Sequence, residues 1–124
     1  MGLTHIAVEL RNLSAEAAVT ITFLVDTGAM ESMAPAASLR NIGIQPVGKR
    51  MYELASGELI EYEYGHVEMR FLDEIIATDI IFGPDTDALL GVVALESAGF
   101  IVDPKSQTLK KLKAIPLKHT AAAK

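Results

Sequence analysis

The 124-residue sequence predicts one closed, mostly β domain with one or two short helices. Half of the residues are hydrophobic and 22% are charged, as in an ordered globular domain. About nine short apolar or alternating runs are separated by turn residues, whereas only 35–42 and 92–98 suggest helices. This length suits one domain, so we expect residues 1–124 to form a single unit with its core over about 3–112. Residues 113–124 are expected to be a flexible tail.

The N-terminal third predicts two strands and a short helix. Loose alternation over 3–10 indicates the first strand, and the β-branched run 17–25 indicates a second, buried one. Residues 30–34 have mixed polarity and no clear period. Pro35 is expected to occupy the first position of the helix, and Gly43 is expected to end it.

Residues 46–71 predict a long β-hairpin followed by a further strand. Ser56 and Gly57 supply the turn signal. Both faces of the ribbon carry glutamates, so it lacks the continuous apolar face that packing in a core requires. We therefore expect the hairpin to project. Gly65 is expected to separate it from a cleanly alternating strand over 66–71.

The C-terminal third predicts strands around one helix. An apolar strand is expected over 75–82, and a shorter one over 88–91 ends in glycine. Residues 92–98 then predict a two-turn helix with Gly99 as its C-cap. A strand, a turn and another strand follow over 100–112.

Composition excludes several classes of function. The net charge is −5 without a stripe of Lys and Arg, which argues against a nucleic-acid partner. Cysteine is absent and the three histidines lie far apart, so disulfides, metal sites and bound cofactors are not expected. Neither a secretory signal nor a membrane-spanning run is visible. We expect a cytoplasmic protein with no membrane partner.

The tripeptide Asp26-Thr27-Gly28 stands at the end of the second predicted strand. A carboxylate delivered into an apolar neighbourhood is costly unless the protein uses it. The threonine hydroxyl can donate a hydrogen bond, and the glycine permits a sharp turn and a close backbone approach. Asp and Gly are also ordinary turn residues, so the tripeptide alone could simply end a strand.

Two motifs in their order resemble the retropepsin-like aspartic proteases. Residues 23–29, Phe-Leu-Val-Asp-Thr-Gly-Ala, match that family's apolar-apolar-x-Asp-Thr/Ser-Gly-Ala pattern. Residues 88–91, Ala-Leu-Leu-Gly, match the apolar-apolar-Gly segment that crosses behind the catalytic loop, and a helix follows as in the family. The resemblance covers about 3–112, and 89–104 are most similar to small prokaryotic proteins of this clan.

The resemblance implies an acid-protease barrel with a flap hairpin, working as a C2 homodimer. It also implies a role for particular residues. These are the catalytic Asp26; the active-site supports Thr27, Gly28 and Ala29; the substrate-binding flap residues Ala55, Ser56 and Gly57; and the loop supports Leu89, Leu90 and Gly91.

A dimer also follows from the chemistry. Aspartic proteolysis needs one ionised carboxylate to take a proton from water and one protonated carboxyl to polarise the scissile carbonyl. The chain has a single Asp-Thr-Gly, so the second carboxyl group must come from a second copy of the chain, related to the first by C2 symmetry. The sequence thus predicts a homodimeric aspartic endopeptidase acting on peptides or proteins, with water activated between Asp26 and its symmetry mate.

Two alternatives stay open. Residues 30–34 are more polar and bulkier than in the family, and only Gly57 breaks a hairpin tip that is glycine-rich in retroviral members. A catalytically inactive module of the same fold, which dimerises or binds peptides, would also fit. An Asp-nucleophile phosphatase is less favoured, because no second Asp stands at position 28 and no βα alternation follows.

Further polar residues have two interpretations. Asp79 lies in an apolar strand, where an edge position would account for it. Tyr52, Tyr62 and Tyr64 either line a substrate groove or pack against one another across the hairpin.

Overall fold

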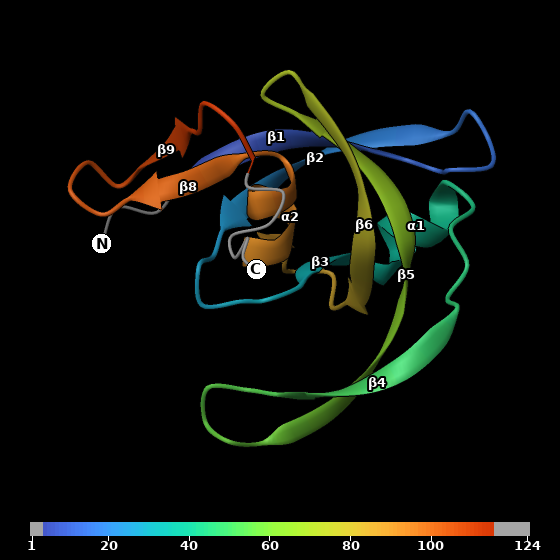
Figure 1. Cartoon of the computed structure of the whole chain (residues 1–124). Coiled ribbons are helices and arrows are strands. Elements are labelled where there is room, and N and C mark those ends of the chain that lie inside the picture. Colours follow the sequence, from blue (N-terminus) through green and yellow to red (C-terminus); the bar gives the residue numbers. More distant parts are fainter. Residues whose placement is uncertain (1–3, 116–124) are drawn as a thin grey trace, which may run out of the picture.

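A computed structural model describes residues 4–115, which form nine strands and two short helices (Figure 1). The predicted mostly β class is confirmed. The expected flexible tail lies for the most part outside the described residues. In this part of the chain no helix is both long and apolar enough to cross a membrane. The elements are β1 His5–Arg11, β2 Ala18–Val25, β3 Ser32–Pro35, α1 Ala36–Asn41, β4 Gly48–Glu53, β5 Leu59–Phe71, β6 Glu74–Gly83, β7 Leu89–Leu90, α2 Val92–Ser97, β8 Phe100–Asp103 and β9 Thr108–Lys111.

Seven of these strands form one sheet in the order β1-β2-β7-β3-β6-β5-β4. β1 also pairs with β5, so strands from distant parts of the sheet meet (Figure 1). Most neighbours are antiparallel, but β7 runs parallel to β2 and β3 runs parallel to β6. β8 and β9 form a separate two-stranded sheet beside α2.

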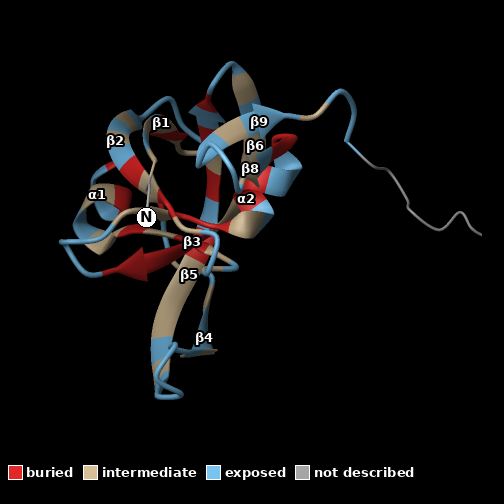
Figure 2. Cartoon of the chain, turned by 90° about the vertical axis from the view of Figure 1, so that its left-hand side faces the viewer, coloured by how far each residue is buried: buried red, intermediate tan, exposed pale blue. Residues whose placement is uncertain are grey.

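The core collects alternate side chains of the strands and one face of each helix. In β5, the buried Val67, Met69 and Phe71 alternate with His66, Glu68 and Arg70. Burying each large apolar side chain contributes about 1.5–3 kcal/mol. Figure 2 shows these buried segments gathered in the body of the molecule. The largest fully buried side chains are Phe23, Leu10, Leu39, Met69, Ile80, Leu90, Val8 and Val67.

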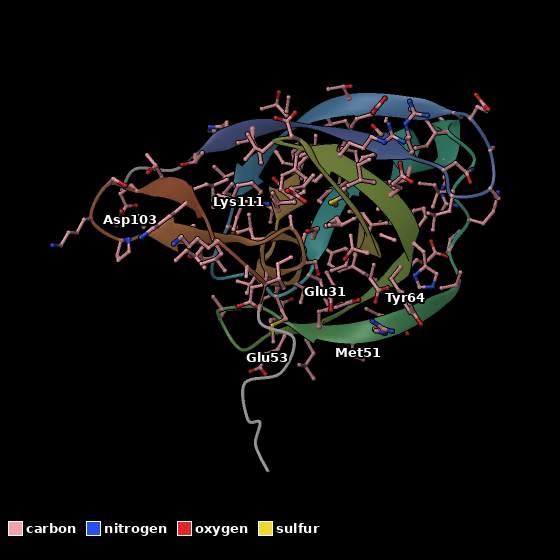
Figure 3. All side chains as sticks on the ribbon, turned by 45° about the horizontal axis from the view of Figure 1, so that its top comes forward. Glu31, Met51, Glu53, Tyr64, Asp103 and Lys111 are labelled. Atoms are coloured by element: carbon pink, nitrogen blue, oxygen red, sulfur yellow. The ribbon has the colours of Figure 1, made fainter. Side chains whose placement is uncertain are left out.

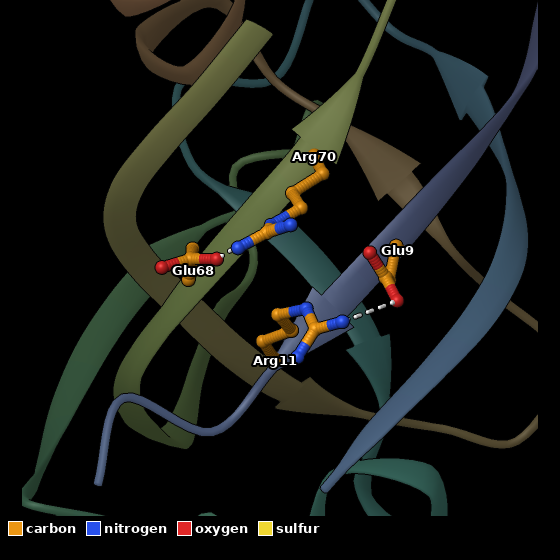
Figure 4. Close-up of polar contacts among 4 residues, drawn as sticks. All are labelled: Glu9, Arg11, Glu68 and Arg70. Atoms are coloured by element: carbon orange, nitrogen blue, oxygen red, sulfur yellow. Dashed lines mark hydrogen bonds and ion pairs between the residues drawn. The ribbon is translucent and has the colours of Figure 1, made fainter. Parts of the chain in front are cut away.

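Four charged side chains line the outer face where β1 meets β5 (Figure 4). Arg11 binds Glu9 at 3.3 Å and Arg70 binds Glu68 at 2.8 Å, each within its own strand. The register also sets Glu9 opposite Arg70 and Arg11 opposite Glu68. Because all four are partly exposed, each pair contributes at most about 1 kcal/mol, but opposite charges face each other throughout.

The predicted hairpin is formed by β4 and the first part of β5, which extend away from the body (Figures 1 and 2). Its tip is closed by hydrogen bonds from the Leu54 and Gly57 N–H groups to the Glu58 and Leu54 carbonyls, both at 2.8 Å. Gly57 has φ +89°, which favours glycine. The turn predicted at Ser56-Gly57 is confirmed.

The predicted break at Gly65 is wrong, because β5 runs without interruption from Leu59 to Phe71. Gly65 pairs with Ile80 inside the sheet. A Cβ at this position would lie 3.0 Å from the Gln45 carbonyl oxygen and 3.1 Å from the Phe82 ring. This glycine therefore marks a close approach of neighbouring chain rather than a turn.

Strand β3 was not expected from the sequence. Ser32 and Ala34 are buried while Met33 and Pro35 are half-buried, an alternation too short to stand out. The strand forms through parallel pairing with β6, a partner almost fifty residues away. Pro35 ends β3 and is the N-cap of α1, so the helix begins one residue later than expected.

A polar cluster joins the base of the hairpin to the sheet. Arg50 of β4 donates to Asp79 of β6 at 3.2 Å, and the His66 ring lies 3.0 Å from the other oxygen of that carboxylate. The Arg50 guanidinium also stacks on the Tyr64 ring at 3.7 Å. Asp79 pairs with His66 on one side, whereas β3 joins β6 only from Ile80 onward. These contacts account for a carboxylate in an apolar strand.

Backbone hydrogen exchange should divide β5 into two parts. Residues 59–63 pair only with the outer strand β4, whereas residues 68–70 pair with β6 on one side and with β1 on the other. We expect exchange at 59–63 to be at least about tenfold faster, since a two-stranded ribbon opens without breaking the core. Amide exchange resolved by mass spectrometry or NMR measures this within one strand. Equal protection along β5 would show that the hairpin is held by contacts elsewhere.

Candidate active site

The loop that carries Asp26 starts where β2 pairs with β7. The parallel register sets Leu24 beside Leu89 and Val25 beside Leu90. The Leu24 N–H donates to the Ala88 carbonyl at 2.9 Å, and the Asp26 N–H donates to the Leu90 carbonyl at 3.0 Å. The two motifs recognised in the sequence, although more than sixty residues apart, are therefore bonded to each other.

The Asp26 side chain stabilises the turn of its own loop. Its Oδ1 accepts a hydrogen bond from the Gly28 N–H at 2.9 Å, and the Asp26 carbonyl accepts one from the Ala29 N–H at 3.1 Å. A Cβ on Gly28 would approach that carboxylate oxygen to 3.2 Å. Asp26 is half-buried and Thr27 and Gly28 are exposed. The carboxylate is thus oriented by the backbone while remaining open to solvent.

Helix α2 holds the loop from behind. The Val92 N–H donates to the Ala29 carbonyl at 2.9 Å, and the Val93 N–H donates to the Met30 carbonyl at 3.1 Å. The loop carbonyls thereby satisfy donors of the first helical turn, which no side chain caps. Leu89 and Leu90 pair with the strand that leads into this loop, and their supporting role, like that of Gly91, stays a prediction.

Ser32 contributes a contact that the sequence did not reveal. It is 2% exposed, and its Oγ accepts a hydrogen bond from the Gly91 N–H at 2.9 Å. A buried N–H group without a partner costs about 1–3 kcal/mol, so this hydroxyl stabilises the crossing of the two motifs. Its signal in the sequence is weak, because a single serine among methionines is equally typical of a loop.

A groove of about 590 Å³ opens between the Asp26 loop and the hairpin. Asp26, Gly28 and Ala29 form one wall and Ala55 at the hairpin tip belongs to the opposite one. Ser56 and Gly57 do not line it. The other lining residues are Met30, Glu31, Met33, Met51, Tyr52, Glu53, Leu54, Tyr62, Ile81 and Leu89.

Tyr52 and Tyr62 both line the groove and pack together, with ring centroids 6.2 Å apart, so the two interpretations of the tyrosines hold at once for this pair. The Tyr52 hydroxyl is buried without a hydrogen-bond partner in the part of the chain described. Burial raises the pKa of Tyr52; Arg50 opposes this rise and the charge of Glu31 adds to it. The phenol therefore stays protonated and can donate a hydrogen bond.

Thr27 points to a different surface. It lines a separate hollow of about 410 Å³ on the α2 and β8 side, together with Val92, Leu95 and Phe100. The Asp-Thr-Gly loop thus has Asp26 facing the groove and Thr27 facing an exposed, partly apolar surface.

Comparison with known proteins identifies the fold. The chain is similar to the solution structure of the protease of simian foamy virus (mac), with a TM-score of 0.55 and 13% sequence identity over 74% of this chain and 91% of that one. No family profile and no curated protein sequence matches the chain. The predicted retropepsin-like fold is supported by this structural likeness, whereas the prokaryotic branch stays a prediction.

Replacing Gly91 with Ala should destabilise the protein severely. The added Cβ would lie 2.6 Å from the Glu31 carbonyl oxygen and 2.7 Å from that of Met30, where neither backbone can yield without moving the loop. We expect the free energy of unfolding to fall by about 3 kcal/mol, the upper end of the range for overpacked core sites, because the clash is with backbone atoms. Urea denaturation followed by circular dichroism measures the loss.

Gly57→Ala is the matched control, since a Cβ there meets no atom within 4 Å. Its left-handed backbone should cost only about 1–2 kcal/mol. An equal loss in both variants would mean that the crossing of loop and β7 is not tightly packed.

Proposed function

We propose that the protein is a homodimeric aspartic endopeptidase. The observation that carries this is the Asp26 carboxylate, oriented by the Gly28 N–H and set in the wall of an open groove within a retropepsin-like fold. Groove, carboxylate and fold are the parts that such a hydrolase needs from each chain.

The dimer follows from the number of carboxyl groups that the reaction uses. Two carboxyl groups at close range cannot both ionise easily and share one proton, as is best known in aspartic proteases themselves. Each chain has one Asp-Thr-Gly loop. A C2 axis beside this loop brings Asp26 to its copy, and the exposed Thr27 then faces the partner's loop.

The chemistry proceeds by general base and general acid steps. The ionised carboxylate takes a proton from water, whose oxygen attacks the peptide carbonyl carbon while the protonated carboxyl donates its proton to the carbonyl oxygen. A tetrahedral diol forms. Its collapse breaks the C–N bond, returns one proton to the dyad and delivers another to the leaving amine, so the pair regains its starting state.

The hairpin serves as the flap in this proposal. Its strands extend beyond the body, and its tip, including Ala55, Ser56 and Gly57, is exposed. An extended peptide between the hairpin and the Asp26 loop can add main-chain hydrogen bonds, and closure of the hairpin would exclude water. The contacts of Arg50 with Asp79 and Tyr64 anchor its base while the tip moves.

The second candidate is an inactive peptide-binding or dimerising module. The observation in its favour is the bulky stretch that follows Gly28, where Met30 is 68% exposed and lines the same groove as Asp26. Such a side chain could restrict access of a scissile bond while leaving the groove able to hold a peptide. A cleavage assay decides between the two.

Asp26→Asn should abolish cleavage of a mixed peptide library while the protein still folds. The amide keeps the shape and can still accept from the Gly28 N–H, but it cannot take a proton from water. We expect loss of at least about 1,000-fold in kcat/KM, as for the removal of an essential catalytic group. Mass spectrometry of the library at mildly acidic pH, with and without a statine inhibitor, measures this.

Asp85→Asn, a change of the same kind in an exposed loop, is the control and should cleave normally. An active Asp26→Asn variant, or a wild-type protein that cuts nothing, would overturn the endopeptidase. In the second case a labelled peptide that still binds the groove would favour the module.

Thr27→Ala should weaken dimerisation without lowering the folding stability of the monomer. Thr27 is exposed in the single chain, so unfolding of the monomer should be unchanged. Loss of its hydroxyl at the axis should raise the dimer dissociation constant by about 5- to 150-fold, equivalent to about 1–3 kcal/mol. Sedimentation equilibrium measures this, with the exposed Thr86→Ala as control. A wild-type protein that stays monomeric at high micromolar concentration would contradict the dimer.

A further inference from the structure

The groove carries a strong excess of negative charge. Asp26, Glu31 and Glu53 line it, and within residues 4–115 no Lys, Arg or His does. Among residues 4–115, neither Glu31 nor Glu53 makes an ion pair. Five other acidic side chains of this part do so with Arg, Lys or His, namely Glu9, Glu63, Glu68, Glu74 and Asp79. The two glutamates therefore have charge available for a ligand.

The three carboxylates are too dispersed for a metal ion. Asp26 and Glu31 stand at opposite ends of the loop between β2 and β3, and Glu53 ends β4. Figure 3 labels the two glutamates. Within residues 4–115 no group of three or more acidic, His or Cys side chains could hold a metal. A ligand that complements these carboxylates must therefore carry its positive charge on extended groups that reach along the groove, as the side chains of a peptide do.

Methionines supply the apolar part of the same groove. Met30, Met33 and Met51 line it, and these are three of the five methionines in the sequence. Met30 is 68% and Met51 is 59% exposed, so their side chains are open to an occupant of the groove. Their flexible thioethers adapt to long aliphatic chains. A Lys or Arg side chain offers such a chain with a cation at its end.

Tyr52 links the acidic and apolar parts. It lies on β4 across the groove from the loop, and the charge of Glu31 acts on its phenol. Its hydroxyl is buried and lacks a partner in this part of the molecule. Tyr52 therefore forms part of the groove wall beside Glu31.

We propose that the groove selects peptides with Lys or Arg close to the scissile bond, and that Glu31 and Glu53 determine this specificity. The aliphatic stem of the basic side chain lies on the methionines, and its ammonium or guanidinium group reaches the glutamates. This assignment rests on the proposed endopeptidase for cleavage, but the binding preference can be tested without it.

The test uses three peptides that differ at one residue, which is Lys, norleucine or Glu next to an otherwise apolar cleavage sequence. We expect wild-type protein to cleave the Lys peptide about five- to tenfold better in kcat/KM than the norleucine peptide, the size expected of two partly exposed ion pairs. The Glu peptide should be poorest. Raising the salt concentration should shrink the preference, because these charges are screened.

The double variant Glu31→Gln and Glu53→Gln should lose the preference while still cleaving the norleucine peptide. Glu58→Gln is the matched control, because Glu58 lies on the same hairpin without lining the groove. Equal cleavage of all three peptides by wild-type protein would overturn the specificity and leave the endopeptidase standing.

Fluorescence anisotropy of the same labelled peptides on Asp26→Asn protein separates binding from catalysis. Tighter binding of the Lys peptide, lost in the glutamate double variant, supports the proposal even where nothing is cut. Equal binding of the Lys and norleucine peptides by this variant contradicts it, whatever the cleavage assay gives.

Discussion

The crossing of the Asp26 loop with β7 is the constraint on which the rest of the site depends. Two residues of β7 pair in parallel with the end of β2, and Gly91 passes within contact of the Met30 and Glu31 carbonyls. The Ser32 hydroxyl satisfies the Gly91 N–H at this point. No side chain larger than hydrogen fits there. The close approach of Gly91 to the loop therefore fixes the positions of the Asp26 carboxylate, the groove wall and the start of α2.

Patterns of neighbouring residues predicted the parts of the fold that depend on short-range features, such as hydrophobic alternation and helix capping. Strands β1, β2 and β6 alternate or run apolar over enough residues to be identified, and Gly43 and Gly99 follow their helices with φ +84° as expected. The tripeptide at Asp26 was identified because a carboxylate after an apolar strand is unusual. A short apolar strand over 88–91 was also predicted from its residues, but only the family resemblance identified it as the partner of the Asp26 loop.

The features that sequence reasoning missed depend on distant neighbours. Strand β3 exists through its parallel pairing with β6, and Gly65 is a close approach to Gln45 rather than a break. The buried role of Ser32 is visible only once Gly91 is beside it. The composition of the groove could not be predicted from the sequence either. Glu31 and Glu53 line the same groove, but β3 and α1 lie between them in the chain.

The proposed dimer and the proposed specificity are physically coupled. A C2 pair would bring two copies of the acidic groove wall toward one axis, and like charges at short range oppose that approach. A basic peptide lying between the loops would neutralise part of this charge and contact both copies. Substrate binding and dimerisation would then favour each other by the same free energy, since linkage is reciprocal. The acidity that opposes the empty dimer is, on this argument, also what selects its substrate.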